Sequence, residues 1–546
     1  MTSIWLLLGV ALVVQGKVLV KKNKEKLPEY LEWPEQYTVS AERLSLTDDV
    51  VEDYQMWTAP QKSRIDYNEG YVKSIVKRDD GYEKYSLHPE IDENNEVSII
   101  CKHIITGRIE LETILPEDTV SYSNVGKEKV NDVDTIKFTY DYIDDTTDYR
   151  QTIWAAYDHK NSVWIPVRYE ALEFNVWRAF KEKHEIWNFF KFSTNFSSPE
   201  DIFNEESQYN CTDEEETELG KVLTKNLLLA NPDKKHHVEQ VFREFKKGHA
   251  KKYTNKDEQK LRRSIFKKNL RRVISHNRRN LGYKLTLNHF SDKTDEEMSK
   301  HMGLKRRPQG KAGNIPFPYD ESKVKSMGDE LPNEYDARLL GLVGSVKNQE
   351  ECGCCWTIGT TAAVEGALAR TNGGKLMALS NQALIDCAWQ FGGSGCNGGT
   401  DNAAYEWMME YGLPTEAEYG TYLNQDGVCN ISNMTKKFPI KGYTDVPPLG
   451  VDALKIALIN HGPLSVSVHA SDNFKLYASG IFYDTACDQL MLNHEITLVG
   501  YGEKDGDTYW IIKNSWGPAW GIGGYAFISA RDNNCGIATE PTYVVF

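Results

Sequence analysis

The sequence has 546 residues but lacks a long hydrophobic run after its first residues, and no later stretch approaches the roughly 18 apolar residues that a membrane helix needs. We therefore expect no membrane span. The apolar run from Ile4 to Val14 is too short to cross a bilayer, and it leads into Val14-Gln15-Gly16, with small residues where a signal peptidase requires them. This pattern predicts a signal peptide over residues 1–16, although Lys and Arg are missing before the apolar run.

The first half of the chain also lacks any cluster of catalytic residue types and is poor in cysteine. Only two of the ten cysteines, Cys101 and Cys211, precede residue 352. Because entry into the secretory pathway permits disulfides, we expect these two to pair. The same route makes four sequons candidate glycosylation sites, namely Asn195, Asn210, Asn430 and Asn433.

The net charge of −15 conceals an uneven distribution. Residues 231–312 contain 24 Lys and Arg against 9 Asp and Glu, whereas residues 331–546 contain 12 against 23. These net charges of +15 and −11 predict an electrostatic pairing within the chain, and two separately solvated surfaces are the alternative. We expect no nucleic acid partner. The hydrophobic content of 40% and the length indicate a globular protein of about three domains.

Residues 17–212 have the pattern of a β-rich domain. Tyr, Val, Ile, Thr and Trp recur in short alternating runs bounded by Asp, Asn and Gly, which predicts antiparallel strands. Residues 201–220 carry eight acidic residues and no basic one, so we expect a solvated segment there and an acidic linker over 213–231. The clearest alternating runs are Arg64–Tyr67, Val97–Ile100, Thr135–Tyr140 and Val163–Tyr169.

From residue 232 the hydrophobic period becomes helical. One predicted helix buries Val238, Val241, Phe242 and Phe245, and a longer one runs from about Leu261 to Ile274. Residues 303–330 then contain Lys305-Arg306-Arg307-Pro308, further prolines and several glycines. This composition predicts an exposed connector with processing sites.

The residues that predict chemistry begin with Gln349 to Trp356. Cys355 opens an apolar helical stretch, and a thiol at a helix N-terminus lies at the positive end of the helix dipole, which favours the thiolate. Gln349 offers an amide as an oxyanion donor. His494 follows 139 residues after Cys355, and Asn514-Ser515-Trp516 follows 20 residues after that. An imidazole can accept the thiol proton, an asparagine can fix its tautomer, and a tryptophan can exclude water from that bond.

Residues 331–546 resemble the papain and cathepsin L type of cysteine protease. The resemblance implies an α+β, two-lobed peptidase with a helical lobe and a β-barrel lobe. It implies that Cys355 is the nucleophile, His494 the general base and acid, and Asn514 its orienting partner, with Gln349 in the oxyanion hole. The matching stretches are Leu331–Asp336, Gln349–Trp356, Leu379–Gln382, Asp386-Cys387, Gly395–Gly399, Gly462–Val466, Asn493-His494, Val499–Gly502, Lys513–Gly517 and Asn534–Gly536.

The resemblance also extends upstream. Residues 232–302 resemble the helical inhibitory prodomain of this family, with Glu258, Arg262, Phe266, Asn269 and Asn277 at the expected spacing and Asn288–Asp292 as a second motif. Thr286 stands where glycine is usual. Arg64–Tyr67, Ile165–Tyr169 and Pro316–Asp320 resemble the two-chain haemocyte proteases of insects. A zymogen is implied, in which the prodomain inhibits the peptidase. The N-terminal domain either binds a partner or carbohydrate or stays as a companion subunit after cleavage in the connector. The location of the protein would be lysosomal, phagosomal or secreted.

The resemblance further assigns disulfides and a substrate cleft. The implied pairs are Cys352–Cys396, Cys387–Cys429 and Cys487–Cys535. Gly398, Gly399 and Trp516 would contact a protein or peptide substrate, and Thr400, Ser467, Leu492 and Glu540 would line its second subsite. An apolar wall would prefer hydrophobic side chains there, while Glu540 would also admit Arg; a Glu540 turned to solvent is the alternative. No His-rich insertion follows Cys429, which favours an endopeptidase.

Two residues depart from the family pattern. Cys354 is left unpaired, so it either competes with Cys352 for Cys396 or is an ordinary exposed thiol. Glu495 follows the histidine where a small residue is usual, and it would favour imidazolium if buried beside His494. These departures leave open a binding protein on a weakened protease scaffold. A soft-metal site formed by Cys352, Cys354, Cys355 and His494 is a third reading, but we expect neither metal nor cofactor.

Overall fold

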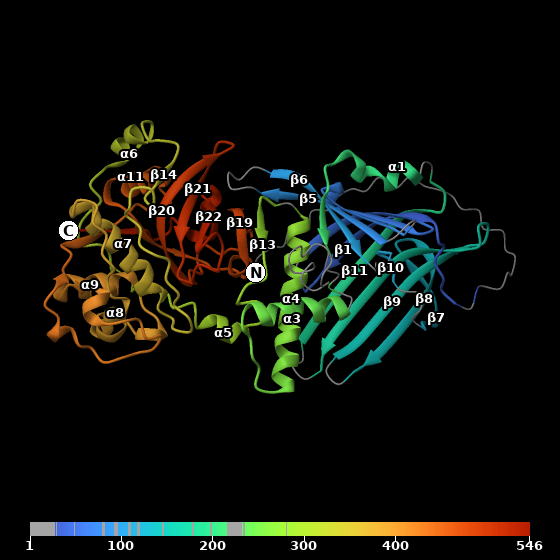
Figure 1. Ribbon diagram of the computed structural model, residues 1–546, viewed down its shortest axis with the longest axis horizontal. Coiled ribbons are helices and arrows are strands. Elements are labelled where there is room, and N and C mark those ends of the chain that lie inside the picture. The colour runs from blue at the N-terminus through green and yellow to red at the C-terminus, as the bar shows by residue number, and fades with distance from the viewer. Residues whose placement is uncertain are drawn as a thin grey trace.

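The computed structural model describes residue 28 and residues 30–546, except 48–49, 79–81, 92–96, 107–110, 117–120, 145–146, 177–179, 197–198, 216–231, 233–234, 280 and 309. The expected signal peptide and most of the expected linker lie outside the described residues. Within them, the chain forms a large N-terminal sheet, a helical pro-region, and a two-lobed C-terminal part (Figure 1). No helix of these described residues is long and apolar enough to cross a membrane.

The N-terminal part is built on one 12-stranded sheet, in the order β12-β6-β5-β4-β3-β2-β1-β11-β10-β9-β8-β7. Its neighbours pair antiparallel except β12 and β6, which are parallel. Alternation produces this sheet: on β1, Tyr37, Val39 and Ala41 are buried. The strands are β1 (Tyr37–Ser45), β2 (Val50–Ala59), β3 (Lys62–Tyr67), β4 (Val72–Lys77), β5 (Tyr82–Ile91), β6 (Val97–Thr106), β7 (Ser123–Val130), β8 (Val133–Ile143), β9 (Thr147–Asp158), β10 (Val163–Asn175), β11 (Phe180–Ser193) and β12 (Thr212–Glu215).

The acidic segment after the last long strand contacts this domain up to residue 215, while most of its side chains from residue 201 to residue 213 are exposed or half-buried, as expected for a solvated segment. It forms α1 (Pro199–Phe203), the 3-10 turn η2 (Glu205–Gln208) and β12. Glu205 pairs with Arg64 at 2.5 Å, and Glu206 pairs with Lys77 at 2.5 Å. Basic residues of β3 and β4 thus neutralise the acids, and the Cys101–Cys211 disulfide ties the segment to the sheet. The local sequence could not reveal these distant partners.

The pro-region lies between the two large sheets (Figure 1). Its helices are α3 (Lys235–Gly248), α4 (Lys256–Arg278) and α5 (Asp295–Ser299). Strand β13 (Tyr283–Leu285) pairs antiparallel with β19 and so extends the C-terminal sheet. On its other side, α4 contacts the N-terminal sheet: the Ser264 hydroxyl donates to Glu182 at 2.6 Å, and the Arg278 guanidinium lies 4.0 Å from the centre of the Tyr67 ring. The prodomain therefore contacts both neighbours.

The C-terminal part has two lobes with separate cores. Trp356, Leu384 and Trp407 belong to the core of a helical lobe, and Tyr501, Trp510 and Ile528 belong to the core of a β lobe. The helices are α6 (Glu321–Gly328), α7 (Cys355–Thr371), α8 (Asn381–Cys387), α9 (Asp401–Tyr411), α10 (Glu416–Tyr419), α11 (Val451–His461) and α12 (Asp472–Lys475). The strands are β14 (Tyr335–Asp336), β15 (Leu413–Pro414), β16 (Lys437–Phe438), β17 (Gly442–Asp445), β18 (Leu464–Val468), β19 (Tyr477–Phe482), β20 (His494–Lys504), β21 (Asp507–Lys513), β22 (Tyr525–Ser529) and β23 (Thr542–Val545).

Candidate active site

Cys355 is the first residue of α7 and is fully buried. The first N–H groups of a helix have no partner within the helix, so the sulfur lies at the positive end of the α7 dipole. Helix α7 packs against β20: the Thr497 hydroxyl donates to the Gly359 carbonyl at 3.1 Å, and a Cβ on Gly359 would lie 3.1 Å from the Glu495 side chain. The small residue therefore lets the cysteine helix approach the strand that begins at His494.

His494 and Asn514 meet where two antiparallel strands end together. His494 opens β20, Asn514 follows β21, and the imidazole Nε2 lies 2.8 Å from Asn514 Oδ1. The Trp516 ring stacks over the imidazole with centroids 4.5 Å apart, and Trp516 is 1% exposed, so water is kept from the bond. Among the described residues, His494 Nδ1 has no hydrogen-bond partner. That nitrogen remains available for a thiol.

Gln349 is held as an amide donor by a residue that the sequence did not single out. The Ser515 hydroxyl donates to Gln349 Oε1 at 2.7 Å, which leaves the NH₂ group facing the cleft. That nitrogen donates to the Cys352 carbonyl at 2.9 Å and to the His301 carbonyl at 3.2 Å. A pro-region carbonyl thus lies on the proposed oxyanion donor. Ser515 stands between Asn514 and Trp516 in the predicted motif, which was the only signal for it.

The pro-region fills the cleft from His301 to Lys305. The Gly399 N–H donates to the Gly303 carbonyl at 2.9 Å, and the Lys305 N–H donates to the Gly399 carbonyl at 2.8 Å, so the two segments run parallel. A Cβ on Gly303 would lie 1.7 Å from the Gly353 carbonyl oxygen, and therefore only glycine fits there. Gly398 and Gly399, predicted to contact substrate, contact this segment instead. The expected connector is hence exposed only in part.

Burial under the pro-region makes both reacting groups neutral. It raises the pKa of Cys355 to about 12, against a smaller opposing effect from the Glu495 N–H, and it lowers the pKa of His494 to about 4. In this covered state, burial therefore opposes the transfer of a proton from Cys355 to His494, and the thiolate–imidazolium pair stays a prediction for the uncovered enzyme.

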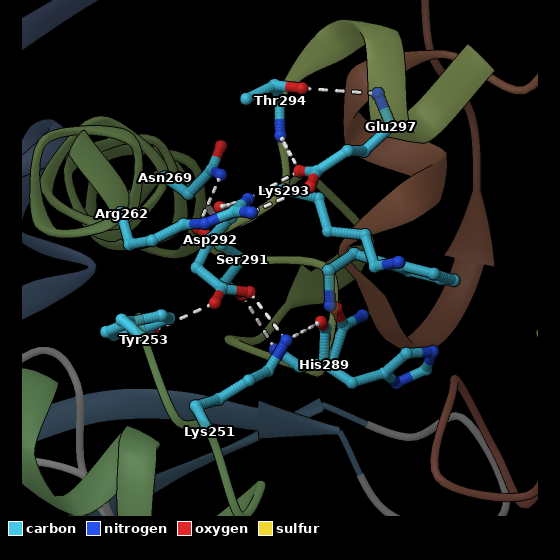
Figure 2. A network of polar contacts seen from close by, with 12 residues as sticks. Lys251, Tyr253, Arg262, Asn269, His289, Ser291, Asp292, Lys293, Thr294 and Glu297 are labelled. Atoms are coloured by element: carbon cyan, nitrogen blue, oxygen red, sulfur yellow. Dashed lines mark hydrogen bonds and ion pairs between the residues drawn. The ribbon is translucent and has the colours of Figure 1, made fainter. Parts of the chain in front are cut away.

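A polar network inside the prodomain holds its second motif in place (Figure 2). Arg262 of α4 donates to Glu297 Oε1 at 2.7 Å and to the Asp292 carbonyl at 3.0 Å. The Asp292 carboxylate accepts from Lys251 at 2.7 Å and from the Tyr253 hydroxyl at 2.9 Å, and Asn269 donates to the Ser291 carbonyl at 2.9 Å. Arg262 and Asn269, two of the spaced residues recognised in the sequence, thus fix this loop.

The loop of the second motif, Asn288–Asp292, packs against the candidate site through an aromatic contact. Phe290 meets Trp516 edge to face with centroids 5.2 Å apart, and it also contacts the His301 ring. The Asn288 side chain donates to the Lys475 carbonyl at 2.8 Å. These contacts place the prodomain directly over the tryptophan that covers His494. Inhibition by occlusion follows from the geometry.

The residues expected in the second subsite are all buried or half-buried. Thr400 and Ser467 are buried, and Leu492 and Glu540 are half-buried. Thr400 caps α9, because its hydroxyl accepts from the Ala403 N–H at 3.2 Å. Burial raises the pKa of the half-buried Glu540, and its place in the subsite stays a prediction. Asp401, the first residue of α9, was not among the predicted residues.

Both departures from the family pattern are buried. Cys354 has its sulfur 3.2 Å from the Tyr422 hydroxyl, and burial raises its pKa to about 12, so the expectation of an exposed or competing thiol is wrong. Glu495 is 1% exposed, but neighbouring residues of a strand point to opposite faces, and its carboxyl accepts from Thr360 at 2.9 Å rather than meeting the imidazole. Burial, followed by Asp401, raises its pKa far above the usual range.

Eight cysteines form disulfides. The pairs are Cys101–Cys211, Cys352–Cys396, Cys387–Cys429 and Cys487–Cys535. Because Cys352 is oxidised to Cys396, it is not a ligand for the soft-metal site that was an alternative. Within the described part of the chain, no group of three or more metal-ligating side chains stands close enough to hold a metal ion.

Comparisons with known proteins agree with this geometry. The model of the family described as papain family cysteine protease matches residues 331–545, and that of the cathepsin propeptide inhibitor domain (I29) matches residues 242–298. Cathepsin K of Mus musculus is 37% identical over 306 residues, which are 55% of this chain and 91% of that protein. Cathepsin S of Bos taurus is 38% identical over 307 residues, or 55% of this chain and 90% of that protein.

Solved structures give the same result. A digestive procathepsin L2 proteinase from the larval midgut of Tenebrio molitor aligns with a TM-score of 0.52 at 30% identity, over 57% of this chain and all (100%) of that chain. Neither of the two family models covers the N-terminal sheet, whose resemblance to insect two-chain proteases stays a prediction. The chain belongs to the papain family of cysteine proteases, and it carries that family's inhibitory propeptide ahead of the peptidase.

Proposed function

We propose that the processed peptidase is an endopeptidase that cleaves through a thiolate–imidazolium pair. Once the pro-region leaves, solvent reaches the cleft and the burial that keeps Cys355 and His494 neutral is removed. The thiol proton then passes from Cys355 Sγ to His494 Nδ1, the nitrogen without a partner. Asn514 holds the other nitrogen and stabilises the imidazolium.

The proposed reaction has two halves. The thiolate attacks the peptide carbonyl, and the Gln349 amide together with the Cys355 N–H stabilises the oxyanion. His494 gives its proton to the leaving amine, which leaves a thioester, and it then takes a proton from the water that hydrolyses this thioester. Trp516 keeps other water away from the His494–Asn514 bond.

One observation carries this proposal: the imidazole is fixed through Nε2 to Asn514 under Trp516, while Nδ1 has no hydrogen-bond partner among the described residues. The test is labelling of the acid-activated protein by a thiol-directed alkylating reagent, followed by peptide mapping. Label on Cys355 and loss of peptidase activity are expected. Unchanged peptidase activity in Cys355→Ala would end the assignment.

The oxyanion role of Gln349 has its own test. Removing one such donor costs roughly 2.7–4 kcal/mol of transition-state stabilisation, so Gln349→Ala should lose about a hundredfold or more in kcat. Ser515→Ala, which frees the Gln349 side chain without removing it, is the matched variant and should lose less. Equal losses would assign the effect to packing.

The same proposal includes substrate preference and processing. Protein and peptide substrates with a hydrophobic or Arg residue at the second position before the cleaved bond are favoured by Thr400, Leu492 and Glu540. Cleavage within residues 303–330 would release the peptidase, and this segment contains exposed basic residues such as Lys305.

A route through the secretory pathway, to lysosomes or phagosomes or to the outside, is part of the proposal. It is supported by the four disulfides and by the exposure of all four sequon asparagines, which makes glycosylation feasible. Mass measurement with and without a glycosidase tests it.

The N-terminal chain is proposed to stay with the protein after cleavage. Its sheet holds α4 through Glu173 and Glu182, and β13 of the same prodomain holds the peptidase. Retention should therefore depend on an intact prodomain. Size-exclusion chromatography after autoactivation would show whether the N-terminal chain and the peptidase elute together. Intact mass would show whether residues 235–285 are still present when they do.

The alternative of a binding protein on a decayed protease scaffold has no observation in its favour. Its two grounds were Cys354 and Glu495, and both side chains are buried and contact other residues, Tyr422 and Thr360. A failure of Cys355 to react with the thiol reagent after the pro-region is removed would revive it.

A further inference from the structure

Arg307 of the connector lies in an acidic pocket of the peptidase. Its Nη2 donates to Asp401 Oδ2 at 2.9 Å and its Nη1 donates to Asp445 Oδ1 at 2.8 Å. The Arg307 side chain is 13% exposed, although its neighbours Arg306 and Pro308 are exposed. A guanidinium is taken out of water only where carboxylates replace its solvation. The pocket is therefore complementary to this cation.

Asp401 is the innermost carboxylate that touches the guanidinium. Its side chain is 10% exposed, against 33% for Asp445, and its Oδ2 also accepts from the Thr542 hydroxyl at 2.9 Å. Asp445 has a second role, because its other oxygen accepts from the Gly313 N–H of the connector at 2.8 Å. Asp445 thus anchors the connector, whereas Asp401 faces the arginine and residues of the enzyme itself.

Two further carboxyls lie within electrostatic range of the same arginine. Glu540 is half-buried, and Arg307 lowers its pKa against the effects of burial and of Asp401. Glu495 lies deeper, fully buried, with Oε2 unpartnered among the described residues. Its hydrogen bonds to Thr360 and Ser465 hold it beneath the cleft. An apolar side chain in this pocket would leave these polar groups without solvent or partner, which is unfavourable.

The pocket is continuous with the strip that binds backbone. Gly399, whose N–H and carbonyl both pair with the pro-region, is followed directly by Thr400 and Asp401. A substrate residue paired with Gly399 would have its side chain beside Thr400 and Asp401. The position is the same second subsite that the proposed function describes, and the inference rests on that function.

We propose that this subsite selects a basic side chain, that Asp401 is the specificity-determining residue, and that Arg307 occupies the subsite in the zymogen as an internal mimic of the substrate cation. Glu540 adds to the selection but does not make it alone. Substrates with Arg at the second position are then cleaved in preference to those with a hydrophobic residue there. The residue after the catalytic histidine, Glu495, is part of a specificity pocket rather than a sign of decay.

The direct test compares two dipeptide amides on the activated full-length protein, Arg-Arg and Leu-Arg, by kcat/KM. The native enzyme should prefer Arg-Arg. A charge-assisted hydrogen bond in a buried site accounts for a factor of about 10 to 100, so Asp401→Asn should lower the Arg/Leu ratio by that factor while the concentration of titratable active sites stays unchanged. Glu540→Gln should lower the ratio less.

Glu406→Gln is the matched control, because Glu406 lies on the same helix and pairs with Lys311 at 2.7 Å outside the pocket. Its ratio should equal that of the native enzyme. A native enzyme that prefers Leu-Arg, or an Asp401→Asn ratio equal to the native one, would overturn the inference but leave the peptidase assignment intact. If neither amide is cleaved and Cys355 does not react with the thiol reagent, the proposed function itself has failed.

A second test does not require that Asp401 variants fold. Synthetic peptides of residues 301–314 are assayed as inhibitors of the activated native enzyme. Arg307→Ala should weaken inhibition about tenfold or more, and Arg306→Ala, which removes an exposed arginine next to it, by less than about threefold. Equal inhibition by the Arg307→Ala and unchanged peptides would show that the pocket does not recognise the cation.

Discussion

Basic residues of the pro-region bind acidic sites on the N-terminal sheet and on the peptidase. The carboxyl pKa values at these two sites are shifted in opposite directions. On the N-terminal side, Glu173 accepts Lys267 at 2.9 Å and Arg271 at 3.1 Å; burial alone would raise its pKa, but these two cations lower it to about 2. On the peptidase side, Arg307 lies among carboxyls that include Glu540, whose pKa burial raises. Mild acid therefore leaves the first site charged and neutralises part of the second.

The histidines of the prodomain strengthen this contrast. Burial lowers the pKa of His276 to about 3, of His289 to about 4 and of His301 to about 3. At the contact of α4 with the peptidase, burial would raise the pKa of Asp472, but Arg272 and Lys475 together lower it below its usual range. The groups that make the docking of the prodomain sensitive to acid are mainly these buried histidines, because burial favours their neutral form.

The largest effect should come from breaking the charged site on the N-terminal side. In Glu173→Gln, Arg271 and Lys267 stay buried and lose their common partner, which costs about 3–5 kcal/mol. The urea midpoint of the transition that releases α4 from the sheet should fall accordingly, followed by protease cleavage within α4. Glu170→Gln, on the same strand but with a partly exposed carboxylate, is the control. An equal fall in both variants would contradict the comparison.

Acid should act mainly on the peptidase side. His301 stabilises the docked prodomain fully above its free pKa near 6.5, and this stability is lost as pH falls through that value toward about 3. At pH 5 the loss is about 2 kcal/mol for this residue. The half-time of autoactivation should therefore shorten between pH 7 and pH 5, and His301→Gln, which stays neutral, should flatten that dependence.

The control for this measurement is His236→Gln, since His236 is exposed at the start of α3. It should follow the native pH dependence. Over the same range the contact of Glu173 with α4 stays ionised, so the N-terminal part and the prodomain should still co-elute at pH 5. We predict that the peptidase is released first. Separation of the N-terminal part from the prodomain before release of the peptidase would contradict this order.

The smallest effect should come from an exposed ion pair on the same helix. Arg263 of α4 pairs with Glu239 of α3, with side chains 38% and 36% exposed. Solvent screens such a pair, so Glu239→Gln should change the free energy of unfolding by less than about 1 kcal/mol. Urea denaturation of Glu239→Gln and Glu173→Gln in parallel measures the difference. A comparable loss of unfolding free energy in both variants would mean that burial does not distinguish the exposed ion pair from the buried one.

Much of the site was predictable because local spacing carries it. The helix that begins at Cys355, the partners His494 and Asn514, and the prodomain residues Arg262 and Asn269 all lie where their motifs indicate. The alternating runs around residues 64, 97, 135 and 163 are strands β3, β6, β8 and β10. Their order in the sheet was not predictable, since the pairing of β1 with β11 joins residues more than 140 positions apart.

The features that the sequence did not predict have a common cause. Glu205 and Glu206 looked solvated because their partners, Arg64 and Lys77, lie far away in the sequence. Glu495 was read against its neighbour His494, although adjacent strand residues face opposite sides. The sequence position of a charged residue does not show which residues surround its side chain after folding.

The amino-acid sequence by itself determined the chemistry of this protein, because a nucleophile, a base, an orienting amide and an inhibitory signature each depend on residue types at fixed local spacing. The tertiary structure alone decided which of these groups are charged and what they select. Covering Cys355 and His494 with Gly303 and its neighbours makes them neutral, and bringing Arg307 to Asp401 turns a subsite into a pocket for a cation. Both outcomes follow from desolvation, which depends on distant segments meeting in space.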